Sequence, residues 1–170
     1  MNLTMEDGMA RTPGRKSASK RSSNALSLLK TDHQEVSALF EKYEKGGERL
    51  TTQQKASLAK EICEALTVHA QIEEEIFYPS CREHVDKAED LLAEAKVEHQ
   101  SLKELIYKIE QEQPGSEAFD AEVKVLGEYV KHHVKEEQNE LFPKVRKSEL
   151  DLAELGDQLA ARKEQLQKEA

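Results

Sequence analysis

The sequence predicts an all-α fold, and two observations support this. Strong helix formers such as Glu, Lys, Leu, Ala and Gln are abundant among the 170 residues, whereas there are only 7 Gly, 4 Pro and no Trp. Apolar residues also recur at steps of three and four in stretches that end at Gly or Pro, which is the pattern of amphipathic helices. We therefore predict an up-down-up-down four-helix bundle followed by an extra C-terminal helix, with an open helical array as the alternative.

The first two helices have clear boundary signals. An apolar stripe begins near Asn24 and stops at the glycine pair 46–47. A capping box of Thr51 and Gln54 then opens a second stripe, and we expect this helix to end or kink at Pro79.

Three more helices follow. A third pattern runs from about 87 to 111 and is broken at 114–115, and Ser116 can cap a fourth helix that reaches Pro143. Ser148 opens a charged fifth helix with one leucine face. That face consists of Leu152, Leu155, Leu159 and Leu166. We expect it to pack on the bundle, and dimerisation is the alternative.

Composition divides the chain into a tail, a bundle and a last helix. Residues 1–23 lack apolar periodicity and carry five basic against two acidic side chains, which predicts a disordered basic tail. The bundle is expected at 24–147 and the packed C-terminal helix at 148–170. The net charge of −9 argues against nucleic-acid binding, although contact of the tail with RNA, DNA or anionic lipid is an alternative.

No apolar stretch resembles a signal peptide or a membrane span, so the sequence predicts a soluble, cytoplasmic protein without membrane contact. Cys63 and Cys81 lack a CxxC spacing, and we expect both to be reduced packing residues.

The chain contains an internal repeat of about half its length. Two segments read His-x-x-x-Glu with a proline ten residues after the histidine; they are His69, Glu73 and Pro79, and His133, Glu137 and Pro143. The preceding segments 32–34 and 98–100 also align, as Asp-His-Gln and Glu-His-Gln. One helix pair is therefore used twice, and each copy supplies one isolated histidine and one His-x-x-x-Glu pair.

The repeat predicts a two-metal site. Residues four apart share one helix face, so each His-x-x-x-Glu pair projects together into the apolar stripe. The candidate ligands are His33, His69, Glu73, His99, His133 and Glu137. Burying these groups unpaired would cost several kcal/mol each, and a bound cation satisfies them most directly. Imidazole and carboxylate suit iron, manganese or zinc, and bridging glutamates would leave coordination free for an oxide bridge and a small ligand.

Other polar residues have simpler interpretations. A single histidine on a helix face is usually a satisfied core or surface residue, and we interpret His84 and His132 as non-ligands because they fall outside the repeat. Tyr129 lies one turn before His133, where core packing is favoured over a hydrogen bond to a ligand.

At these residues the sequence resembles the hemerythrin-like, HHE cation-binding family over roughly 25–145. The resemblance implies a four-helix bundle with a non-haem di-iron centre bridged by Glu73 and Glu137. The donor set itself also allows manganese or zinc, and an oxide or hydroxide as a further bridge. It departs from the oxygen-carrying hemerythrins at Lys103, where those have a histidine, and at Gln138, where they have an aspartate. The ligand set is similar to that of bacterial iron-centre repair proteins and iron-sensing hemerythrin domains, but the cysteine-bearing N-terminal domain of the repair proteins is absent here.

These observations predict a metal-binding protein whose di-iron centre binds or senses O2, NO, peroxide or iron in stress or iron homeostasis. A di-iron enzyme that decomposes peroxide or reduces NO is the alternative, and the sequence leaves open whether turnover occurs. A purely structural bundle is a third interpretation. The expected partner is a small exogenous ligand, and the chain is expected to be a monomer or a dimer.

Overall fold

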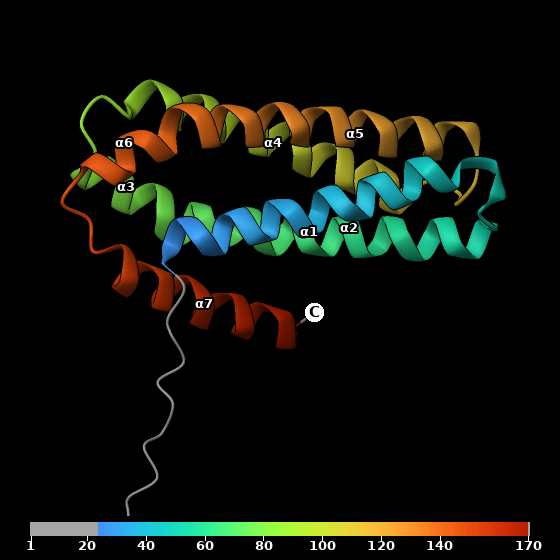
Figure 1. The fold of residues 1–170 in the computed structure, drawn as a ribbon. Coiled ribbons are helices and arrows are strands. Elements are labelled where there is room, and N and C mark those ends of the chain that lie inside the picture. Colours follow the sequence, from blue (N-terminus) through green and yellow to red (C-terminus); the bar gives the residue numbers. More distant parts are fainter. Residues whose placement is uncertain (1–23, 170) are drawn as a thin grey trace, which may run out of the picture.

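The computed structural model describes residues 24–169, which form helices and turns without any strand (Figure 1). Four long helices form the bundle and a fifth packs on its side. The bundle helices are α1 (Ala25–Gly46), α2 (Thr52–Ile72), α4 (Glu89–Gln111) and α5 (Glu117–Glu136). The fifth helix is α7 (Leu152–Glu169). The prediction of an all-α, up-down-up-down four-helix bundle with an extra C-terminal helix is confirmed. The expected disordered tail, 1–23, lies outside the described residues.

The predicted helix starts are found at their capping residues. The Asn24 side chain accepts a hydrogen bond from the backbone N–H of Ser27, and Ser116 caps α5 in the same way. Thr51 and Gln54 form the expected capping box at the start of α2. A positive φ of 49° at Gly47, a conformation that favours glycine, ends α1.

Neither α2 nor α5 ends at the proline that follows it, Pro79 or Pro143. A π-helical segment, η2 (Glu73–Phe77), is followed by α3 (Tyr78–His84), and η3 (Glu137–Leu141) is followed by α6 (Phe142–Lys147). Each proline lies in the first turn of the new α-segment, where its missing N–H costs little. Both π-turns begin at the glutamate of a His-x-x-x-Glu pair, and π-turns inside helices often mark functional sites.

The C-terminal helix starts later than predicted. Ser148 closes α6 by donating to the Val145 carbonyl, whereas Asp151 accepts from the first N–H groups of α7. The leucine face of α7 is buried against α1 and α2, on the side away from α4 and α5 (Figure 1). In the structure α7 therefore packs on the bundle, while the division into domains at 147 and 148 stays a prediction.

Two apolar clusters fill the bundle, one toward each end. The first contains Leu29, Ile72, Phe77, Leu92, Phe142 and Leu159, and the second contains Val36, Ile62, Leu66, Ile106, Val123 and Leu126. Cys81 and Cys63 are free thiols buried in the first and second cluster, as their expected packing role requires. Along each of the four helices the change from one cluster to the other falls near a histidine, so a polar layer crosses the middle of the bundle.

Within residues 24–169, no helix is both long enough and apolar enough to cross a membrane.

Candidate metal centre

The polar layer contains all six predicted ligands. Each of them is at most 6% exposed, although histidine and glutamate usually lie at protein surfaces. His33 comes from α1, His69 and Glu73 from α2 and η2, His99 from α4, and His133 and Glu137 from α5 and η3. The structure therefore brings together every residue that the repeat predicted, one histidine from each long helix.

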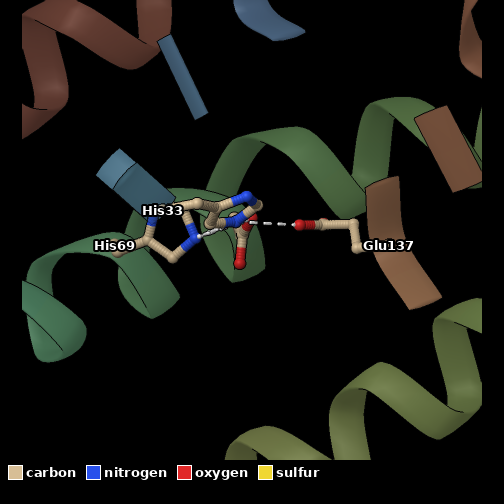
Figure 2. A group of neighbouring side chains, drawn as sticks. His33, His69 and Glu137 are labelled. Carbon is tan, nitrogen blue, oxygen red and sulfur yellow. Dashed lines mark hydrogen bonds and ion pairs between the residues drawn. The ribbon is translucent and has the colours of Figure 1, made fainter. Parts of the chain in front are cut away.

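Four of these side chains form a first group. The Nε2 atoms of His33 and His69 are 3.0 Å apart, and the two rings meet edge to face with centroids 4.8 Å apart. Glu73 Oε1 lies 3.1 Å from His69 Nε2, and Glu137 Oε2 lies 3.2 Å from His33 Nε2. Figure 2 shows the two imidazoles turned toward each other and the Glu137 carboxylate reaching them from the facing side.

The other two histidines form a second group with the same design. The Nε2 atoms of His99 and His133 are 3.3 Å apart, their ring centroids are again 4.8 Å apart, and Glu73 Oε2 lies 3.3 Å from His99 Nε2. Glu73 thus directs one oxygen to each group. Donor atoms at right angles around an ion at about 2.1 Å are roughly 3.0 Å from one another, so spacings of 3.0–3.3 Å fit a shared cation.

A phenol that the sequence analysis missed lies in the second group. The Tyr78 hydroxyl is 3.1 Å from Glu73 Oε2, 3.3 Å from Glu137 Oε1 and 3.3 Å from His99 Nε2. Tyr78 is therefore a further oxygen donor for a cation held there. Tyr129, by contrast, is 47% exposed, so both interpretations of that residue, core packing and a bond to a ligand, are wrong.

The π-turn explains why Tyr78 was missed. In a regular α-helix a residue five positions after Glu73 would point about 140° away from it. In η2 the backbone N–H of Tyr78 instead donates to the Glu73 carbonyl five residues back, which returns Tyr78 to the same face. The sequence does contain one signal for Tyr78: the matching position of the second repeat is Phe142, so the hydroxyl is present in only one copy.

Each histidine also has a partner on its outer nitrogen, Nδ1. In each half of the repeat, the acidic residue just before the isolated histidine contacts Nδ1 of the histidine on the next helix. Asp32 Oδ2 is 3.2 Å from Nδ1 of His69, and Glu98 Oε2 is 2.6 Å from Nδ1 of His133. Such carboxylates fix the ring so that Nε2 faces the centre, as the outer partners of metal-binding histidines do.

The residue after each clustered glutamate completes this set. Glu74 Oε1 lies 2.9 Å from Nδ1 of His99, and the Gln138 amide lies 2.9 Å from Nδ1 of His33. Lys103 donates to both oxygens of Glu74. The two positions that differ from oxygen-carrying hemerythrins, Lys103 and Gln138, therefore support the cluster from outside rather than pointing into it.

The charges in the cluster are strongly coupled. Burial disfavours an ionised Glu73, but His69 and His99 outweigh it and hold the pKa of Glu73 well below its usual value. Burial likewise disfavours a charged His69, yet Glu73 and Asp32 raise the pKa of His69 to about 10. The pKa of Tyr78 is raised well above its usual value by burial and by the Glu137 and Glu73 carboxylates.

Two buried carboxylate oxygens, Glu73 Oε1 and Glu137 Oε2, lie near histidine nitrogens without making a hydrogen bond. A buried carboxylate oxygen without a donor is costly, and a cation between the imidazoles would satisfy both. The donor set of nitrogen and oxygen fits iron, manganese or zinc.

A small cavity of about 20 Å³ adjoins the four histidines on the side of the second apolar cluster. Its apolar walls include Val36, Leu66, Leu102 and Val130. This space is enough for about one water.

His84 and His132 both lie outside this buried group. His84 is exposed and its Nδ1 approaches the Ser80 carbonyl, whereas His132 faces outward beside Glu98 and Glu136.

These features define a helical-bundle protein built to hold cations between its helices. Residues 24–145 match the Hemerythrin HHE cation binding domain, and the chain belongs to that family.

Known proteins agree with this fold. A crystal structure of a Hemerythrin HHE cation binding domain-containing protein, the Rv2633c homolog from Mycobacterium kansasii, superposes with a TM-score of 0.73 at 23% identity, covering 86% of this chain and 89% of that one. A curated relative from Nostoc sp., named DNA nickase, is 28% identical over 139 residues, which are 82% of this chain. The match spans only 37% of that relative's length.

Proposed function

We propose that the chain holds a di-iron centre that binds or senses a small ligand, O2, NO or peroxide, or responds to iron itself, in stress or iron homeostasis in the cytoplasm. The observation that carries this proposal is the division of the cluster: two histidine pairs share Glu73, and Glu137 reaches from His33 to Tyr78. Manganese and zinc are the alternative metals.

The protein residues have distinct tasks in this proposal. The four imidazoles and two carboxylates hold the ions, and the outer carboxylates on Nδ1 keep each ring oriented. Phe142 stacks 6.1 Å from the His33 ring, and together with the fully buried Phe77 it excludes water from that end. When bound, two iron ions supply electrons to, or accept them from, a small ligand, and the cavity beside the histidines limits its size.

A second candidate is an enzyme that decomposes peroxide or reduces NO. The Tyr78 hydroxyl favours it, because a phenol that donates to Glu73 at 3.1 Å holds a proton inside the centre. Reconstitution with Fe2+ without oxygen separates the candidates. A spectral change equal to the added peroxide or NO supports binding or sensing, and sustained turnover supports the enzyme.

Metal analysis tests the common part of both candidates. We expect close to two ions per chain after reconstitution and a higher melting temperature, since a ligand at 100 times its Kd stabilises by about 2.7 kcal/mol. A chain that takes up no iron and melts unchanged would support the purely structural interpretation. The nickase name belongs to a longer relative, and with a net charge of −9 we do not extend DNA cleavage to this chain.

A further inference from the structure

A second cluster of metal-binding groups lies on the outer face of α4 and α5. His132 Nε2 is 3.2 Å from Glu136 Oε1 and 3.5 Å from Glu98 Oε1, and the His132 side chain is 64% exposed. We call these three residues the surface triad. One imidazole and two carboxylates at these spacings can each give one donor atom to the same divalent ion, as first-row metals prefer.

The surface triad touches the buried centre through a shared residue. Glu98 directs Oε1 to the triad and Oε2 to Nδ1 of His133, at 2.6 Å. A small hollow of about 10 Å³ lies beside this residue, and its lining includes Glu136 and Glu98 together with the buried His133 and Glu137. Glu137 of the buried centre thus lines the same hollow as two members of the triad.

The internal repeat provides a comparison within the molecule. Positions 132 and 136 correspond to Val68 and Ile72 in the first half, and both of these are buried in the cluster that α7 covers. The counterpart of Glu98 is Asp32, whose free oxygen is taken by Lys163 of α7 at 2.6 Å. The first half is therefore closed by apolar side chains and a lysine, whereas the second half is uncovered and has a histidine and a glutamate instead.

We propose that the surface triad is an uptake site for a divalent first-row cation such as Fe2+, from which the ion enters the buried centre past Glu98, the residue that contacts both sites. The destination of the ion rests on the function proposed above. Three protein donors leave the remaining positions to water, so an ion is held more weakly there than among the buried ligands and can leave. Such transient binding is what an uptake site requires.

The test compares the wild-type chain with the double variant His132→Ala/Glu136→Gln. Both substitutions leave Glu98, the partner of His133, in place. The matched control is His84→Ala/Glu83→Gln, which removes an exposed histidine and an exposed glutamate from α3. Anaerobic titration with Fe2+ gives the number and affinity of bound ions, and rapid mixing with Fe2+ gives the loading rate.

We expect the wild type and the control to bind two ions tightly and a third more weakly. The triad variant should lose the third ion and load the other two more slowly, with unchanged final occupancy. A wild type without the weak third ion, a variant that keeps it, or an unchanged loading rate would overturn the proposal.

Failure of the proposed function has a different signature, because the wild type would then lack the two tight ions. Helicity and melting temperature check the folding of each variant. The single substitution His132→Asn, at a mostly exposed side chain, carries the same expectation for the third ion with less disturbance of the helix.

Discussion

Lys163 of the C-terminal helix forms an ion pair with Asp32, with 2.6 Å between Nζ and Oδ1, and the other Asp32 oxygen contacts Nδ1 of His69. Burial raises the pKa of Asp32, but the bonds to His69 and Lys163 outweigh it and leave the pKa below its usual value. The Asp32 carboxylate thus connects α7, which lies outside the four-helix bundle, to His69 in the candidate metal centre.

Replacing Lys163 by Met should weaken metal binding roughly tenfold or less. Loss of an outer partner of a metal ligand typically costs about 10–100-fold in affinity, and Lys163 acts one step further out. Competition with a chelator of known affinity measures the change. Lys168→Met on the same helix, which removes an exposed pair with Glu164, is the control and should bind metal like the wild type. Equal losses in both variants would show that α7 stabilises the fold without influencing the centre.

Glu73→Gln should reduce the bound metal from two ions to one or fewer. Glu73 directs an oxygen to each histidine pair, and a neutral amide cannot supply the charge or the two oxygen donors that bridging requires. Elemental analysis after reconstitution gives the stoichiometry. Glu75→Gln, two residues along at an exposed glutamate that pairs with Arg162, should keep both ions. Two ions in the Glu73 variant would contradict a shared carboxylate.

Tyr78→Phe should remove a visible absorption band from the ferric protein. A phenolate bound to Fe3+ absorbs visible light by charge transfer, and the Tyr78 hydroxyl lies within 3.3 Å of donor atoms Glu73 Oε2 and Glu137 Oε1. Binding requires loss of the phenol proton, which a nearby metal charge favours. Tyr129→Phe removes an exposed phenol and should leave the spectrum unchanged. If the wild type lacks the band, Tyr78 acts only as a hydrogen-bond donor.

The six candidate ligands could be predicted because they obey the ordinary helical period and belong to a segment that occurs twice. His69 and Glu73 share a face by their spacing of four, and the second copy at His133 and Glu137 made coincidence improbable. Nothing in that period indicates a π-turn, so the sequence does not reveal Tyr78 and predicts instead that the second helix ends or kinks at Pro79.

The carboxylates that contact Nδ1 of the histidines could be identified only from the tertiary structure. Asp32 is adjacent to His33, so its side chain points about 100° away from it, toward a helix whose position the sequence does not fix. The same holds for Glu98, which reaches His133 across a separation of 35 residues. The sequence of α7 likewise shows only a leucine stripe, which predicts packing. Its contact with Asp32 depends on a single lysine, Lys163, and no pattern indicates that contact.

The metal-free chain should lose stability as the pH rises from about 6.5 to 10. The carboxylates around His69 outweigh its burial and raise its pKa from 6.5 to about 10 in the folded chain. A group whose pKa is raised by folding contributes its full stabilisation below the unfolded value and loses it as the pH approaches the folded value, here on the order of a few kcal/mol. Urea unfolding at pH 6.5 and pH 9.5 measures the difference. In the metal-loaded chain the imidazole is deprotonated throughout, so the fall should vanish. In the metal-free chain His69→Gln should make the fall smaller. The rest comes from His133, whose pKa burial lowers but Glu98, Glu137 and Glu73 raise above its usual value. A metal-free wild type whose free energy of unfolding stays level or increases between the two pH values would show that protonated His69 does not take the place of the cation.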